Sequence, residues 1–246
     1  SAGNPDLQPF TSNNLDIGGE YYTGGIGYIG VTGFQKNIQG FTLTQQSQVT
    51  FGSLNIPFAS LQSTQQNALN DRARATGLAV ENLPITVNRP VNLQSLKIQG
   101  VEATWVQPLD FLVKGLGFSA NGTYLKQSSA SGLVATGVPK WSYNLQGFYE
   151  NHGLSVSLNY VWNDKSIGQN GPQNGISSAF LGNDARGQLD LSAGYQLPFF
   201  NKALRLTVDV LNITNEPIRT IFAYDNAPYS IFYPGRQVLA GIRANF

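Results

Sequence analysis

The sequence predicts an all-β fold, built as an antiparallel transmembrane β-barrel of which this chain supplies about nine strands. Two observations predict it. Apolar and polar residues alternate with a period of two in one segment after another, which is typical of strands whose two faces meet different environments. The connections between these segments are alternately short and long, as are the turns and loops of outer-membrane barrels.

The composition excludes several other classes of protein. Charged residues make up 12% of the 246 residues, about half the share usual in a soluble domain. The formal net charge is +1, so no overall field attracts nucleic acid, and we expect no nucleic-acid partner. Cysteine is absent, which excludes disulfides and thiolate metal sites. No apolar run approaches the roughly 18 residues of a membrane-spanning helix, so a membrane location requires a barrel.

The first three strands are predicted around a long insertion, at 13–22, 25–41 and 93–107. The third contains Glu102, a charge in the middle of a strand. A charge at this depth is expected to face a wet lumen, on the side opposite to Val101 and its apolar neighbours.

The middle of the chain has the clearest alternation. Between 154 and 162 every second residue is apolar, and Ser155, Ser157 and Asn159 occupy the other face. The further segments of this kind are 118–124, 141–146, 188–197 and 204–210.

The final strand, 237–246, ends on an aromatic residue. Its apolar face carries Val238, Ala240, Ile242, Ala244 and Phe246, whereas Arg243 lies on the polar face. A terminal two-faced strand that ends on Phe is typical of outer-membrane barrels. We therefore expect Phe246 to act as the C-terminal signal for barrel assembly.

The strand lengths fit a membrane. About ten residues at ~3.3 Å each, tilted by ~40–45°, rise about 24 Å, close to the apolar band of such a barrel. Tyr and Trp stand at the ends of the apolar faces, as interfacial girdles require. The short connections are 22–25, 108–115, 150–153 and 198–203; the long ones are 42–92, 127–139, 163–186 and 216–235. With the long loops extracellular, the chain ends at the periplasmic rim.

The longest connection, 42–92, is predicted to carry a short helix. Residues 63–66 read Ser-Thr-Gln-Gln, which fits a capping box. The helical pattern continues through 68–73, and Gly77 suits a C-terminal cap. This helix either packs the loop together or contacts a ligand. Residues 84–91 are a candidate for a tenth strand.

Three stretches, taken together, resemble the TonB-dependent outer-membrane receptors. Residues 3–22, GNPDLQPFTSNNLDIGGEYY, are similar to the family's Asn-Pro-x-Leu-x-Pro-Glu-x-Ser segment, with Phe10 in place of the usual Glu. Residues 98–105, IQGVEATW, resemble its Gly-Val-Glu strand entry. Residues 209–219, DVLNITNEPIR, with the closing strand that follows them, resemble its final turn and strand.

The resemblance implies a barrel of about 22 strands around a plug. The plug and the segment that contacts TonB precede the barrel in this family. Residues 1–246 would then be a C-terminal barrel segment without the plug and the N-terminal strands. An odd number of strands also indicates a fragment, because it cannot close an antiparallel barrel. The partners implied are outer-membrane lipid, the TonB complex, the missing plug and strands, and an unidentified cargo, in the cell outer membrane of a Gram-negative bacterium.

The function implied by the resemblance is active uptake of a scarce ligand such as a siderophore, cobalamin or an oligosaccharide. No bond of the cargo is broken, so we expect a transporter and not an enzyme, without a cofactor. A small passive porin or adhesin barrel, complete in itself, is the alternative, and a soluble β-sandwich is a third possibility.

Two sets of residues are candidates for contact with ligand or plug. The first set is aromatic, lies in the last long loop and suits stacking on ligand rings: Tyr224, Tyr229, Phe232 and Tyr233. The second set projects into the predicted lumen, either touching plug and substrate or forming structural salt bridges: Glu102, Asp190, Arg205, Asp209 and Arg243. His152, the one histidine, lies in a short turn without catalytic partners, and we expect no metal site.

Overall fold

The computed structural model describes residues 3–40, 42–92, 95–129, 135–173, 176–199, 204–222 and 224–244. The chain divides into two compact units, Ser1–Ser12 with Ile38–Leu96 and Asn13–Asn37 with Lys97–Phe246. The first unit contains a two-stranded sheet, whereas nearly all strands of a nine-stranded and a four-stranded sheet belong to the second.

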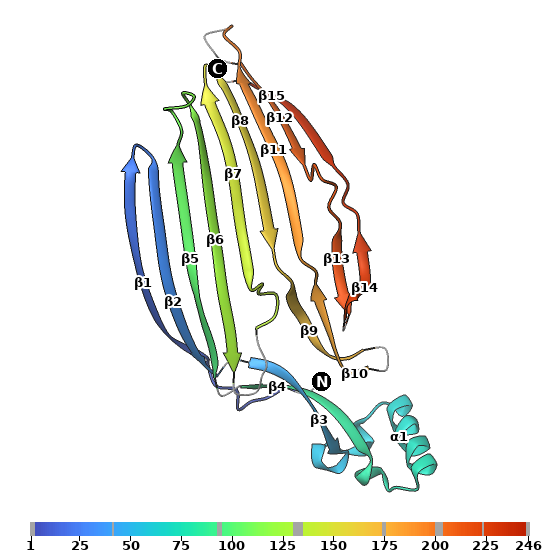
Figure 1. The fold of residues 1–246 in the computed structure, drawn as a ribbon. Helices are drawn as coiled ribbons and strands as arrows, with labels where there is room; N and C mark the ends of the chain where they lie inside the picture. The colour runs from blue at the N-terminus through green and yellow to red at the C-terminus, as the bar shows by residue number, and fades with distance from the viewer. Residues whose placement is uncertain are drawn as a thin grey trace. The chain divides into compact units, whose positions relative to one another are not determined.

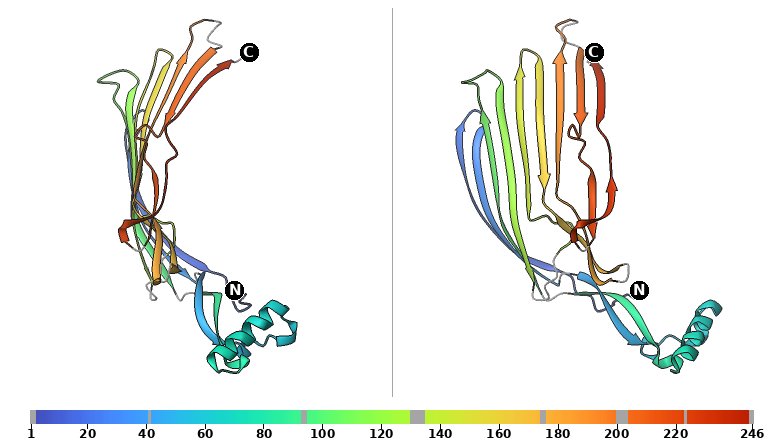
Figure 2. Two further views of the ribbon diagram at one scale, coloured as in Figure 1. Left: turned by 90° about the vertical axis from the view of Figure 1, so that its right-hand side faces the viewer. Right: turned by 45° about the vertical axis from the view of Figure 1, so that its right-hand side comes forward.

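The nine-stranded sheet confirms the nine predicted strands. It has the order β1-β2-β5-β6-β7-β8-β11-β12-β15, as the neighbouring ribbons of Figure 1 show. The strands are β1 (Thr11–Gly24), β2 (Gly27–Gln39), β5 (Leu96–Pro108), β6 (Leu116–Ser129), β7 (Trp141–Asn151), β8 (Leu154–Asn163), β11 (Arg186–Gln196), β12 (Leu204–Leu211) and β15 (Gln237–Ala244). Seen edge on in Figure 2, the sheet curves instead of lying flat. It is open, with β1 and β15 at its edges.

The register of the strands places apolar residues next to one another across the sheet. Val208 of β12 lies opposite Ala240 on one side and Ala193 on the other. The same row continues from Ala193 to Val156, Tyr149 and Leu116. A shift by one residue would move every side chain of a strand to the other face, so this register defines one apolar face.

That apolar face is uncovered among the residues described. Val238 and Ile242 expose 69% and 74% of their surface, and Leu158 in the middle of the sheet exposes 44%. Contiguous exposure of large apolar side chains on this scale marks a surface that contacts another apolar medium. The opposite face is polar, with the row Ser119, Gln146, Asn159 and Asp190 running across four strands.

Aromatic rings gather on β6, β7 and β8 near the long connections. The rings of Tyr143 and Trp162 stack with centroids 5.2 Å apart, and those of Tyr124 and Trp141 are 4.4 Å apart. At the other end of the sheet, beside the short turn between β5 and β6, Trp105 meets Phe118 edge to face at 4.8 Å, which places Trp105 on the apolar face. These pairs agree with the predicted placement of aromatic residues at the ends of the apolar face.

Two connections predicted as long loops are hairpins instead. Residues 163–186 contain β9 (Ser166–Gln173) and β10 (Ile176–Asn183), and residues 216–235 contain β13 (Ile218–Phe222) and β14 (Tyr224–Phe232). The four strands form one sheet in the order β14-β13-β10-β9, because β10 pairs with β13. Between 166 and 183 Gly, Asn, Gln and Ser predominate. Apolar and polar residues alternate only in strands whose two faces differ in polarity, so a search for alternation did not find these strands.

Asn212 forms the corner where the chain leaves β12 for the four-stranded sheet. It has φ 55°, in the left-handed region, and is only 4% exposed. Its Nδ2 donates to the carbonyl oxygens of Glu216 and Gly235 at 3.2 and 3.0 Å, and its Oδ1 accepts from the Glu216 amide at 2.8 Å. The backbone amide of Asn212 donates to Asp190 at 2.8 Å. This one side chain therefore joins the exit of β12 to the entry of β15.

The first unit is a small fold of its own. Its sheet pairs β3 (Thr42–Thr50) with β4 (Pro84–Asn92), and Phe51, Leu83 and Val87 are buried. Asn92 exchanges hydrogen bonds with the backbone of Gln8, at 2.8 and 2.9 Å. The short 3₁₀ helices are Gly52–Leu54, Phe58–Ser60 and Val80–Asn82.

Two predictions about this unit need correction. The helix exists, α1 (Ser63–Thr76), and ends at Gly77 with φ 68°, but its capping box is formed by Gln62 and Gln65, not by Ser63. A glutamine side chain can accept the hydrogen bond of an N-cap, which composition rules overlook. Residues 84–91 are part of a strand, but that strand pairs with β3 and adds no tenth strand to the nine-stranded sheet.

Replacing Asn212 by Ala should lower the free energy of unfolding of the full-length protein by about 2–4 kcal/mol, because a left-handed residue and buried hydrogen bonds are lost together. Thermal unfolding in detergent measures this. Asn212→Gly should lose less of the free energy of unfolding than Asn212→Ala, because glycine adopts a positive φ without strain. Asn215 is exposed and has φ 56°, so Asn215→Ala should lower the free energy of unfolding only by the cost of a positive φ. Equal effects of Asn212→Ala and Asn215→Ala would contradict the role of the buried hydrogen bonds.

Candidate functional site

The predicted aromatic residues lie on a strand, not in an irregular loop. Tyr224, Tyr229 and Phe232 belong to β14 and Tyr233 follows it, with exposures of 69%, 52%, 62% and 64%. Tyr224 is the first residue of this 9-residue strand and Tyr233 comes directly after its last. At ~3.3 Å per residue, the two tyrosines are therefore roughly 30 Å apart. The four residues therefore cannot line one small pocket. Tyr229 instead has its ring 6.1 Å from that of Phe222 on β13.

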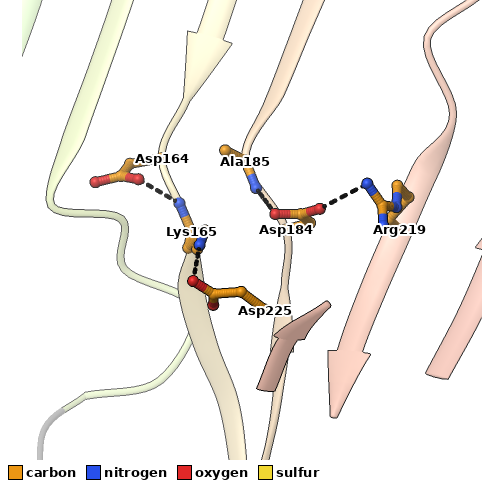
Figure 3. Close-up of polar contacts among 6 residues, drawn as sticks. All are labelled: Asp164, Lys165, Asp184, Ala185, Arg219 and Asp225. Atoms are coloured by element: carbon orange, nitrogen blue, oxygen red, sulfur yellow. Dashed lines mark hydrogen bonds and ion pairs between the residues drawn. The ribbon is translucent and has the colours of Figure 1, made fainter. Parts of the chain in front are cut away.

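Two ion pairs hold the hairpins of the four-stranded sheet together (Figure 3). Lys165 Nζ lies 2.5 Å from Asp225 Oδ2, and Arg219 lies 3.3 Å from Asp184. The first pair joins the start of β9 to β14, although these strands are the two edges of the sheet. Asp225, by accepting a hydrogen bond, raises the pKa of Lys165. The contact is therefore present below the usual pKa of lysine and is lost only as the pH rises through the raised pKa.

The sequence reasoning missed these four charged residues. The signal that could have found them is their rarity, because charged residues are only 12% of the chain. In a sequence with so few charges, acidic and basic residues within the predicted loops are candidates for ion pairs with one another.

The structure brings three of the five predicted lumen residues together. Arg205, Asp209 and Arg243 line one shallow depression on the polar face, beside β8 and β11. Arg205 donates to Ser155 Oγ at 2.5 Å, and Ser192 donates to Asp209 at 2.6 Å. Gly194 leaves the room for Arg205, since a Cβ there would lie 2.8 Å from the guanidinium.

The depression holds two arginines and two acids, but its two arginines lie side by side. Arg205 and Arg243 are directly opposite each other on β12 and β15, an arrangement that is unfavourable for like charges. Glu150 lines the same depression as Asp209. Among the residues described, neither arginine forms an ion pair within 4.0 Å.

The two other predicted lumen residues lie elsewhere. Asp190 accepts hydrogen bonds from Gln188 Nε2 at 2.9 and 3.0 Å and from the Asn212 amide, so its carboxylate stabilises the corner after β12. Glu102 of β5 is exposed, and strand alternation puts it on the face opposite to Trp105. Phe246 lies outside the described residues, so its predicted role in assembly stays a prediction.

The described residues contain no cluster of three or more His, Cys, Asp or Glu that could hold a metal ion. His152 occupies a turn position with φ 50° between β7 and β8. Within the same described ranges, no helix has both the length and the apolar character needed to cross a membrane.

Taken together, the fold defines a class of protein: a curved antiparallel sheet with one exposed apolar face, one polar face, and turns and elaborated hairpins at opposite ends. The family described as TonB dependent receptor-like, beta-barrel matches residues 1–213. The chain belongs to this family.

Several solved structures share the fold of this chain. A ferric enterobactin receptor of Pseudomonas aeruginosa, bound to enterobactin, superposes with a TM-score of 0.66 at 20% identity, covering 98% of this chain and 32% of that chain. The siderophore receptor PirA of Acinetobacter baumannii gives 0.64 at 17% identity, with coverage of 99% and 33%. The copper transporter OprC gives 0.63 at 14% identity, with coverage of 98% and 32%. The chain thus spans about a third of these proteins, and no curated protein matches it.

Replacing Asp225 by Asn should loosen the hairpin β13–β14 and accelerate amide hydrogen exchange between 224 and 232. The midpoint of global unfolding should hardly move, because solvent-exposed ion pairs contribute little to overall stability. Asp71→Asn, which removes the i,i+3 pair with Arg74 on α1, is the matched control and should leave exchange at 224–232 unchanged. Unaltered exchange in both variants would contradict the bridging role of Asp225.

Proposed function

We propose that this chain is the C-terminal barrel segment of an outer-membrane receptor that takes up a scarce ligand with energy delivered through TonB. The observation that carries the proposal is the family match over most of the chain, on a sheet whose exposed apolar face suits lipid. The polar face would line the lumen, and the hairpins β9–β10 and β13–β14 would face the cell exterior.

In this proposal, further strands and a plug complete the barrel. The outer edges of β1 and β15 have no partner strand among the described residues. Each backbone group left unpaired in lipid would cost several kcal/mol, so the edges require partners in the membrane. Arg205 and Arg243 would then face acidic or anionic groups in the lumen.

Ligand capture would use the aromatic side chains of β14. Tyr229, Phe232 and Tyr233 are exposed, and aromatic faces stack well on flat rings. The ion pairs of Lys165 and Arg219 would hold this strand in place before the ligand arrives, which reduces the ordering that binding must supply. Ferric siderophores, as bound by similar receptors, are the first ligands to test.

The test is uptake in a strain that lacks the gene, with and without the full-length protein restored. Ferric enterobactin, ferric pyoverdine and copper are the probes, chosen from proteins of the same fold. We expect one probe to accumulate only when the protein is present and to stop when the inner membrane is uncoupled. Uptake that persists after uncoupling would identify a passive barrel and refute the proposal.

Alanine at Tyr229 or Tyr233 of the full-length receptor should weaken binding of the transported probe by about tenfold, since one stacked ring contributes on the order of 1 kcal/mol or more. Binding to purified receptor measures it. Tyr195→Ala, on the apolar face near the opposite end of the sheet, is the control and should leave affinity unchanged. Unchanged affinity in all three variants would remove β14 from the binding site.

A further inference from the structure

The short turn between β5 and β6 presents apolar side chains to the outside. Phe111, Leu112 and Val113 expose 77%, 64% and 49% of their surface. They lie beyond the ends of the strands, at the end of the sheet where the other short turns lie (Figure 1). The apolar face of the sheet therefore does not explain them.

Hydrogen bonds within the turn and from its neighbour define the backbone that presents these side chains. Asp110 accepts a hydrogen bond from the Gly115 amide at 2.7 Å, and the Val113 amide donates to Leu109 at 3.1 Å. The neighbouring turn supports it from the side, since Asn151 Nδ2 donates to the carbonyl oxygen of Lys114 at 3.0 Å. The backbone is thus held while the apolar side chains point away from it.

A cation follows the apolar residues directly. Lys114 is exposed and forms no ion pair within 4.0 Å among the described residues, and the one acid of the turn, Asp110, is engaged by Gly115. Exposed apolar side chains beside a free cation suit the boundary between acyl chains and anionic headgroups of a lipid leaflet.

The same pattern recurs at one other short turn. Residues 198–202 read Pro-Phe-Phe-Asn-Lys, and Phe199 is 63% exposed. In the sequence of both connections a proline precedes the aromatic or aliphatic residues and a lysine follows them. The turn at 151–153, Asn-His-Gly, is polar.

We propose that the turn 109–115 is a membrane anchor that inserts apolar side chains into the periplasmic leaflet and places Lys114 at its phosphates. The proposal rests on the membrane location given under the proposed function. The anchor would fix the depth of this side of the barrel in the bilayer.

Spin labels on single cysteines test it, because this chain contains no cysteine of its own. The full-length protein, with any other cysteine replaced, is placed in vesicles of phosphatidylethanolamine and phosphatidylglycerol. Accessibility to oxygen, which enriches in lipid, is compared with accessibility to a water-soluble nickel chelate. The test site is Phe111→Cys. The lipid control is Leu158→Cys on the apolar face, and the water control is Glu150→Cys, on the polar face at the same rim.

We expect the label at 111 to resemble that at 158, with nickel accessibility severalfold below that at 150. A label at 111 that resembles 150 would place the turn in water, and one shielded from both reagents would place it against protein; either result overturns the anchor. If the label at 158 also fails to reach lipid, the membrane location itself is wrong. Lys114→Glu should make the label at 111 shallower in these vesicles but not in pure phosphatidylcholine, and no change would contradict the role of the lysine.

Discussion

Backbone pairing between strands is the constraint on which the rest of this structure depends. A strand inside a bilayer has no water to satisfy its amide and carbonyl groups, so neighbouring strands must satisfy them. Pairing fixes the register, and the register decides which side chains share a face. The row from Ala240 through Val208 to Leu116 exists because six strands are in register, and the polar row that ends at Asp190 exists for the same reason. Both faces of the sheet follow from one ladder of hydrogen bonds.

The strands of the large sheet could be predicted from the sequence, because their alternating apolar and polar residues reflect the different environments of the two faces. All nine strands of the large sheet were predictable, but their ends were less exact: β6 extends beyond the predicted 118–124 at both ends, whereas β2 is shorter than the predicted 25–41. The hairpins were not predictable in the same way. The sequences of β9 and β10, SIGQNGPQ and ISSAFLGN, show no regular alternation of apolar and polar residues. Their pairing depends on β10 meeting β13 across a long stretch of sequence, which no local pattern reveals.

The candidate residues divide in a similar manner. Residue type and alternation placed Arg205, Asp209 and Arg243 on one face, and they do line one depression. Sequence alone could not show that Asp190 is engaged by the amide of Asn212, because this contact requires the chain to turn back at a left-handed residue. Nor could it show that the aromatic residues of β14 are spread along a strand. Charged residues outside the nine-stranded sheet, such as Lys165 and Asp225, have partners that are distant in sequence and near in space.

The joining of β10 to β13 has a consequence for how such receptors can change over time. A hairpin that stands alone can be exchanged or lengthened without regard to its neighbours. Here two hairpins share one sheet and two ion pairs, so a substitution at a paired residue of one hairpin changes a contact of the other. The insertion between β2 and β5 has its own small core around Leu83 and is free of that restriction. Substitutions should therefore accumulate separately in the insertion, and in concert in the two hairpins.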